Sequence, residues 1–282
     1  MRKGIIITLV VLTCCFCVWW LTQYHNANIW TVVVVSLLIN IVSGPLYFFV
    51  IEGLYNFKHF GLFWKSYVRY RNKDVRFSIS YIFRIKVKDK FLLVKNRKGN
   101  YYQPVGGAYK TLPRIETIFK KYKVQPDNRF ETSHGIAKND LRFRVKGKNV
   151  MNIIRWFNSR ENRETSQWRE FCEELLTTNI ISNKHVFRYI DYEYASTLQT
   201  PMKKAKKIDC QEILIYEIFD LVPNDEQIIE LERMLTIGDT EKVKFADEVL
   251  IKNLGFDERT KEINYEIGAQ TKWTLLEKWT DD

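Results

Sequence analysis

Two long apolar runs dominate the beginning of the chain. Residues 5–22 and 29–51 contain no Asp, Glu, Lys or Arg. A helix of about 20 apolar residues is long enough to cross a bilayer, and the polar segment 23–28 is suited to a turn between two such helices. The pattern predicts a transmembrane hairpin within residues 1–52. A cleaved signal peptide fits less well, because no small-residue cleavage site follows the first run.

Basic residues on either side of the two runs predict an orientation. Arg2 and Lys3 precede the first run, the turn contains no Lys or Arg, and several basic residues follow the second run: Lys58, Lys65, Arg69, Arg71, Lys73 and Arg76. By the positive-inside rule, both termini are expected in the cytoplasm of a two-pass protein of the cell inner membrane. The basic and aromatic residues of segment 53–75 predict a juxtamembrane linker.

From Arg76 onward the apolar positions alternate as they do in strands. The segment 77–96 is rich in β-branched and aromatic residues, with a turn expected at Lys88–Lys90. Further patterns predict strands at 142–148, 187–196 and 212–222, and helices at 225–235, from Asp239 or Thr240 to Gly255, and at 272–279. Strands interrupted by a helix and followed by helices predict an α+β fold for residues 76–282, with a mixed sheet covered on its faces.

Composition limits the kinds of ligand and catalytic site that the sequence predicts. The 282 residues carry a net charge of +11, which is consistent with phosphate ligands, nucleic acid or a position beside anionic lipid, and the lipid interpretation is preferred. The five cysteines form no CxxC pair, which argues against a zinc site and a disulfide framework. The four histidines are scattered, and the chain contains no GxSxG or Walker-type loop.

Two segments could contact a ligand. Gly106 and Gly107 follow Pro104, and a glycine pair lets the backbone approach a ligand closely, although such a pair is more often a simple turn. In the strand at 142–148, Arg142 and Arg144 share one face. They are either phosphate ligands or the solvated face of an edge strand, and the pattern alone leaves both interpretations open.

The segment around Arg169 contains the most specific chemistry. On a helix, Glu170, Glu173 and Glu174 stand at positions i, i+3 and i+4, so the three carboxylates share a face and repel one another unless a cation compensates. Hard oxygen ligands on one rigid helix suit Mg²⁺, with Mn²⁺ as the alternative. By charge alone, however, an acidic helix face is usually ordinary solvated surface.

The order of these features resembles a Nudix hydrolase domain. A strand, the glycine pair and then Arg169–Glu174 match the core of the family's box, Gx5Ex7REUxEExGU, in which U is apolar. Glu161 stands at the spacing of the earlier glutamate, and Glu164 could replace it if the loop were re-formed. Arg155 and Leu176 occupy the positions of the box's first and last glycines. A long insertion, about 111–160, separates the glycine pair from the box.

The resemblance implies roles for these residues. Glu173 and Glu174 would be metal ligands, Glu170 a ligand or general base, and Arg169 would orient the carboxylates through a salt bridge. In the family such glutamates hold one to three Mg²⁺ or Mn²⁺ ions that activate water against a nucleoside diphosphate. Replacement of the box glycines favours binding over turnover, because those glycines shape the loops around the helix.

Membrane helices followed by a divergent Nudix domain also resemble the SMODS-associated Nudix effectors of bacterial antiphage systems (CBASS). That resemblance implies a Nudix domain that senses a cyclic nucleotide, through residues such as Gly106, Gly107, Arg142 and Arg144, and membrane helices that disrupt the inner membrane during abortive infection. The expected partners are the bilayer, a nucleotide and a second copy of the chain, with no nucleic acid. The alternatives are a membrane-anchored Mg²⁺-dependent hydrolase and a purely structural anchor.

Overall fold

The computed structural model describes residues 16, 19, 20, 33, 37, 60–97, 99–127, 139–205 and 208–276. The chain divides into two compact units, residues 1–65 and 66–282. In the first unit, the helix α3 (Phe60–Trp64) buries Phe63 and exposes Phe60 and Trp64.

The predicted transmembrane hairpin is contradicted, and the fold class and localisation that included it are corrected here. None of the described helices combines the length and the apolar character that a bilayer crossing requires. The longest helix with assigned bounds, α7 (Asp225–Ile237), has 13 residues and carries charged side chains, whereas a crossing takes about 20 apolar residues. Apart from five single positions, the runs 5–22 and 29–51 lie outside the described residues. We therefore retain neither the hairpin nor the two-pass inner-membrane localisation.

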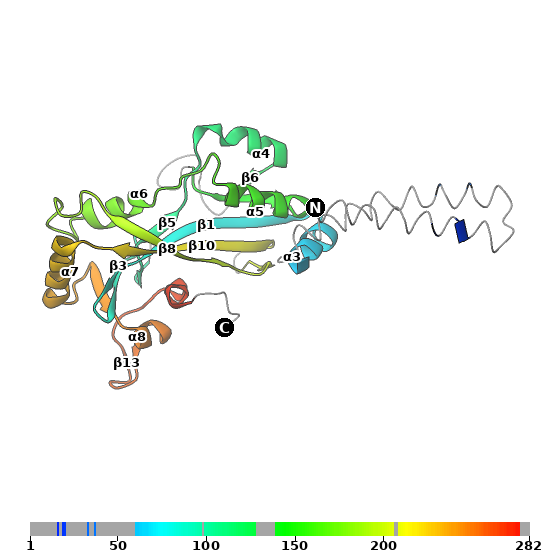
Figure 1. The fold of residues 1–282 in the computed structure, drawn as a ribbon. Coiled ribbons are helices and arrows are strands. Elements are labelled where there is room, and N and C mark those ends of the chain that lie inside the picture. Colours follow the sequence, from blue (N-terminus) through cyan, green and yellow to red (C-terminus); the bar gives the residue numbers. More distant parts are fainter. Residues whose placement is uncertain are drawn as a thin grey trace. The chain divides into compact units, whose positions relative to one another are not determined.

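A seven-stranded mixed sheet forms the centre of the second unit (Figure 1). Its core is β1 (Asp74–Arg84), which runs parallel to β10 (Gln211–Val222) with Val75 opposite Gln211 and Arg84 opposite Asp220. The other edge of β1 pairs antiparallel with two shorter strands, β5 (Gly106–Ala108) and β7 (Arg142–Lys146). Three strands complete the sheet: β6 (Gln125–Pro126), β8 (Asp191–Gln199) and β9 (Lys203–Lys204).

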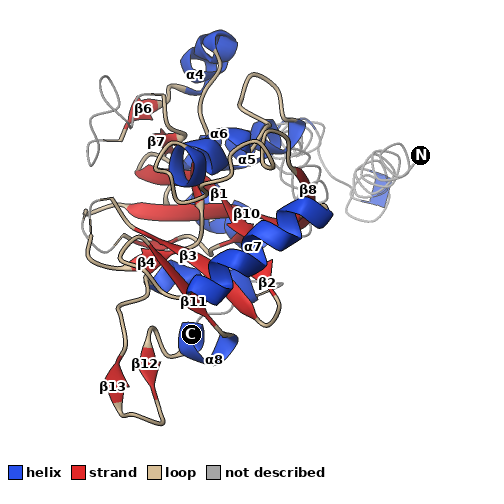
Figure 2. Ribbon diagram, turned by 90° about the vertical axis from the view of Figure 1, so that its left-hand side faces the viewer, coloured by secondary structure: helices blue, strands red, loops and turns tan. Residues whose placement is uncertain are grey.

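Helices cover one face of this sheet and a second sheet lies toward the other (Figures 1 and 2). The helical layer contains α4 (Glu116–Tyr122), α5 (Val150–Ser159) and α6 (Trp168–Phe171). The second sheet has four strands: β2 (Lys86–Val87), β3 (Lys90–Lys95), β4 (Tyr102–Gln103) and β11 (Val243–Ala246). Near it lie α8 (Glu248–Lys252), a 3₁₀ helix (Ala269–Leu275) and a hairpin of β12 (Phe256–Asp257) and β13 (Glu262–Ile263).

Burial on both faces explains why β1 has nine consecutive buried residues. Its apolar side chains face the helices, where Phe83 packs against Phe171 of α6 at a ring-centroid distance of 5.9 Å. Its polar alternate positions, Ser78 and Ser80, are also buried, on the opposite face. Phe171 is fully buried, and burying a phenylalanine contributes about 1.5–3 kcal/mol. The core therefore fixes the position of α6 over the sheet.

Most of the predicted elements are present. The turn at Lys88 joins β2 to β3, and Lys88 adopts a positive φ of 58°. Helix α7 begins after Asn224, whose side chain accepts a hydrogen bond from the backbone N–H of Gln227 in a reciprocal capping box. The single helix predicted from Asp239 or Thr240 to Gly255 is wrong in its first half. There β11 pairs with β3, because Val243 and Phe245 alternate as strand residues, and Asp247 caps the short α8 instead.

Candidate functional site

Gly106 and Gly107 lie where β5 approaches both β1 and α6. Gly106 has a φ of +155°, a value that side-chain-bearing residues rarely adopt, and an added Cβ would strike the carbonyl oxygen of Tyr81. A Cβ on Gly107 would strike the carboxylate of Glu170. Close packing against the backbone of β1 therefore requires glycine at position 106, whereas a Cβ at position 107 would displace the end of the Glu170 side chain. The pair predicted as ligand contacts faces the glutamate-bearing helix.

The predicted glutamate helix consists of α6 and a π-helical turn, Cys172–Leu176. The backbone N–H of Gly106 donates to Glu174 Oε2 at 2.9 Å. Burial raises the pKa of Glu174 to about 8, although the hydrogen bond from Gly106 opposes the shift. Burial also raises the pKa of Glu170, against the nearby charge of Arg169. The site therefore holds these carboxyl groups in an environment that disfavours their charge.

Arg169 compensates much of this negative charge. Its Nε and Nη2 donate to the two oxygens of Glu164 at 3.0 and 3.2 Å, and its Nη1 lies 2.6 Å from Glu170 Oε1 and 3.4 Å from Glu173 Oε1. Nη2 also donates to the carbonyl of Ala108 in β5 at 2.9 Å. Arg169 thus ties the helix to the strand. We call Arg169, Glu164, Glu170, Glu173 and Glu174 the carboxylate cluster.

Glu164 occupies the place that the box spacing assigned to Glu161. Glu161 is exposed, and its backbone carbonyl accepts a hydrogen bond from Trp156 Nε1 at 2.9 Å. Glu164, in contrast, is bound bidentately by Arg169 and accepts from the backbone N–H of Lys110. Arg155 lies on the exposed side of α5. The first half of the box therefore lies partly in α5, which carries Arg155, and partly in the loop before α6, in which Glu164 takes the position expected for Glu161.

Buried polar groups support the loop that leads into α6. The hydroxyl of Tyr109 donates to Glu217 in a short hydrogen bond, and Gln167 Nε2 donates to the same hydroxyl at 2.9 Å. The guanidinium of Arg163 lies 4.8 Å from the centre of the Tyr109 ring and 4.0 Å from that of Phe157. These residues fix the path of the chain between α5 and the cluster. The sequence pattern did not single them out, because their spacing matches no motif.

Two further residues contact the cluster without having been predicted. The hydroxyl of the fully buried Tyr81 accepts a hydrogen bond from the backbone N–H of Glu170 at 3.4 Å. Arg97 is exposed and its Nη2 donates to the backbone carbonyl of Glu173 at 3.0 Å. Tyr81 could have been inferred from its inward position in the alternating strand. Arg97 carries no sequence signal, since it lies in a loop that only folding brings to the helix.

Arg142 and Arg144 lie on the other face of the sheet from the cluster. Their neighbour Phe143 stacks on Phe77 at 5.5 Å, which places Phe143 toward the helices and the two arginines away from them. In the register of β1, Arg142 lies opposite Ser78, four residues from the partner of Gly106, which is about 13 Å along the strand. The predicted ligand contacts therefore form two separate groups.

The sheet face that carries Arg142 and Arg144, which we call the arginine face, also holds a buried group of ion pairs. Arg76, opposite Arg144 in the register, is 3% exposed and bonds Asp127 at 2.8 Å and Glu212 at 3.1 Å. Beside it, burial raises the pKa of Tyr216 to about 12, with Arg142 and Arg76 acting in the opposite direction. A buried charge of this kind requires partners, because removing either one leaves the other uncompensated.

The cluster offers the donors that Mg²⁺ prefers, but they do not converge. Within the part of the chain that the structure describes, no three His, Cys, Asp or Glu residues are placed so that they could hold an ion. Glu170 and Glu173 face Arg169, and Glu174 faces the N–H of Gly106. As they stand, these residues do not fit a metal, and Glu170 and Glu173 would have to leave Arg169 to bind one.

Comparison with known proteins identifies the domain. No curated protein and no solved structure matches the chain. A family model described as the SMODS-associated NUDIX domain matches residues 74–275, from the start of β1 to the last 3₁₀ helix. This match covers well over half of the chain and confirms the Nudix resemblance, without bearing on the membrane helices. The chain therefore belongs to the SMODS-associated Nudix domain family.

Proposed function

We propose that this chain is the nucleotide-sensing effector of a CBASS-type antiphage system, and that its Nudix domain recognises a cyclic oligonucleotide without cleaving it. Membership of the SMODS-associated family supports the signalling context. The observation that favours recognition over turnover is the replacement of both box glycines, by Arg155 and Leu176. Those glycines shape the loops around the helix in the family's box, and catalysis requires the carboxylates to be directed at a substrate or its metal.

The arginine face supplies a complementary surface for an anionic ligand. Arg142 and Arg144 are half-buried on this face. The charge of Arg142 acts on Tyr216, whose ring centroid lies 4.5 Å from that of Trp273. Arginine binds phosphate in a bidentate manner, and aromatic rings stack on bases. These are the groups that a cyclic oligonucleotide requires from a protein.

Calorimetry of the purified full-length chain against cyclic di- and trinucleotides tests this proposal. We expect saturable binding, recovery of the intact ligand by chromatography, and at least a tenfold loss of affinity in the Arg142→Ala/Arg144→Ala variant, because two charge-assisted contacts are removed. Lys148→Ala, an exposed change just beyond the same strand, is the control. Absence of binding to every cyclic oligonucleotide would reject the sensor function.

A second candidate is a Mg²⁺-dependent hydrolase of nucleoside diphosphate derivatives. It is favoured by the complete match of Arg169–Glu174 to the core of the box. It requires Glu170 and Glu173 to leave Arg169, and Glu174 to leave the N–H of Gly106, before the three could hold an ion. A bound Mg²⁺ would supply a water of lowered pKa and neutralise phosphate charge. Under this hypothesis Glu173→Gln lowers Mg²⁺-dependent hydrolysis about a hundredfold. Equal turnover by the variant and the parent protein would exclude it.

A further inference from the structure

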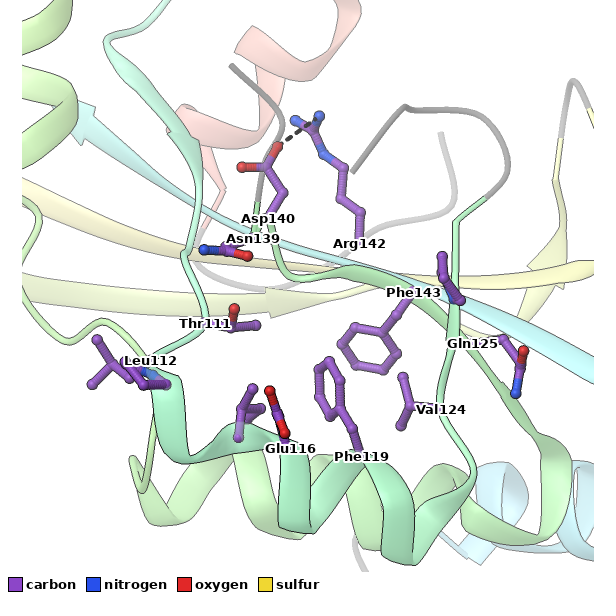
Figure 3. Close-up of a pocket in the computed structure, with 13 residues that line it drawn as sticks. Thr111, Leu112, Glu116, Phe119, Val124, Gln125, Asn139, Asp140, Arg142 and Phe143 are labelled. Carbon is purple, nitrogen blue, oxygen red and sulfur yellow. Dashed lines mark ion pairs between the residues drawn. The ribbon is translucent and has the colours of Figure 1, made fainter. Parts of the chain in front are cut away.

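A cavity of about 450 Å³ lies at the edge of the large sheet, away from the carboxylate cluster (Figure 3). It is formed by segment 111–119, segment 124–126 and residues 139–143 of the insertion. Its volume falls within the range of small-molecule sites, about 300–1,000 Å³. All of its walls come from the insertion, so the cavity belongs to the part of the domain that a short Nudix connection would lack.

The floor of the cavity is aromatic. The rings of Phe119 in α4 and Phe143 in β7 lie 5.3 Å apart at an angle of 51°, and Ile115 and Val124 extend the apolar wall. Figure 3 shows both rings in the centre of the cavity, with Glu116 beside them on α4. A planar heteroaromatic ring can pack on such a surface, and an amino group on its edge can donate to a carboxylate.

Asp140 and Arg142 line one end of the cavity, where Arg142 Nη1 lies 3.1 Å from the Asp140 carboxylate (Figure 3). Asp140 also pairs with Lys110 Nζ, which does not itself line the cavity, so one carboxylate stands between two cations. Asn139 next to it adopts a positive φ of 62°, and its carbonyl accepts from the N–H of Thr111 at 2.8 Å. Asparagine adopts this left-handed conformation more readily than other side-chain-bearing residues. The local geometry thus fixes polar and cationic groups beside an apolar floor.

We propose that this cavity binds the base of a nucleotide, with its phosphate at Arg142 and Lys110. The inference depends on the proposed function for the identity of the ligand, which would be one nucleotide unit of the cyclic oligonucleotide. An aromatic floor, an acceptor at Glu116 and a cationic end correspond in order to the ring, the exocyclic amine and the phosphate of a nucleotide. An apolar peptide would match the aromatic floor but would offer no anion to Arg142 and Lys110, which share the single carboxylate of Asp140.

The cavity is joined to the carboxylate cluster by one short segment. The backbone N–H of Lys110 donates to Glu164 at 3.0 Å while its side chain pairs with Asp140. Two residues earlier, the carbonyl of Ala108 accepts from Arg169. A ligand that draws Lys110 toward its phosphate therefore acts on the residue that also contacts the cluster.

Titrations of the full-length chain with AMP, GMP, CMP and UMP test the proposal, with adenosine and inorganic phosphate as the separate parts of a nucleotide. We expect at least one nucleotide to bind more tightly than either part. Leu112→Trp, at the 45% exposed mouth of the cavity, should fill it and lower nucleotide affinity about tenfold or more. Thr117→Trp adds the same ring at an exposed position of α4 that does not line the cavity, and should leave affinity unchanged.

The Arg142→Gln variant distinguishes the contribution of the phosphate to binding from that of the base. It should weaken nucleotide binding about tenfold and leave adenosine binding unchanged, because only the phosphate contact is lost. Equal affinity of Leu112→Trp and the parent chain for every nucleotide would overturn the inference. The inference would also be overturned if no nucleotide bound the parent chain more tightly than inorganic phosphate does. If cyclic oligonucleotides bind the parent chain and Leu112→Trp equally, the proposed function stands and the cavity assignment falls. If cyclic oligonucleotides bind neither the parent chain nor Leu112→Trp, but the variant still binds mononucleotides more weakly than the parent does, the cavity assignment stands and the proposed function falls.

Discussion

The carboxylate cluster and the group around Asp140 have opposite charge balances. In the cluster, Arg169 pairs with three glutamates, and the fourth, Glu174, accepts from a backbone N–H. Around Asp140, one carboxylate faces both Lys110 and Arg142. An excess of carboxylates favours a cation, and an excess of cations favours an anion. The two regions therefore suit different ligand charges, although Lys110 contacts both.

The difference in charge balance also indicates different roles: the carboxylate cluster stabilises the fold, and the group around Asp140 is suited to ligand recognition. Arg169 crosses from α6 to β5 and holds three side chains and a carbonyl. Asp140 keeps a second cation if Arg142 is removed. Substitutions in the cluster should therefore act mainly on folding, and substitutions beside Asp140 mainly on ligand affinity.

The largest effect is expected from Arg169→Ala. Removing the guanidinium leaves Glu164 and Glu170 largely buried without their counter-charge, which should cost about 3 kcal/mol in the free energy of unfolding. Arg142→Ala should cost less than about 1 kcal/mol, because Asp140 retains Lys110. Urea unfolding of the purified chain measures both. Similar losses in the two variants would remove the distinction between the regions.

Gly107→Ala should have the next largest effect. The added methyl group meets the Glu170 carboxylate, and overpacking of this kind costs about 1–3 kcal/mol. Gly61→Ala is the matched control, since nothing lies within 4 Å of the position of its added Cβ. Thermal unfolding measures both variants. A Gly107→Ala protein as stable as the control would mean that β5 does not press against α6.

The third effect is a slope of stability with pH that comes from Glu174, and it is compared per pH unit. Its pKa rises from 4.5 to about 8 on folding, so the folded chain binds the proton more tightly than the unfolded chain. The stabilisation is complete below pH 4.5 and is lost as pH rises to about 8, by up to about 1.4 kcal/mol per pH unit. Glu174→Gln should flatten this slope in unfolding experiments without metal, and the exposed Glu161→Gln should keep it. An unchanged slope in Glu174→Gln would contradict the assigned burial.

Particular residues show how far the sequence predicts the fold and the site. Alternation in segment 77–96 identifies the strands correctly, and the box spacing identifies Arg169–Glu174 because that spacing is local to one helix. It also points to Glu161, where the structure places Glu164. The loop between Arg160 and Gln167 decides that exchange through buried contacts of Arg163 and Gln167. No local pattern encodes those contacts.

The amino-acid sequence by itself determined the strands, the glutamate helix and the family, since each depends on neighbours within a few residues or on their order along the chain. The tertiary structure alone decided that Gly106 and Gly107 meet Glu174 and Glu170, that Arg142 lies on the opposite face, and that the insertion encloses a cavity. These contacts join residues tens of positions apart. Sheet register and side-chain packing fix them, and neither can be read from a local pattern.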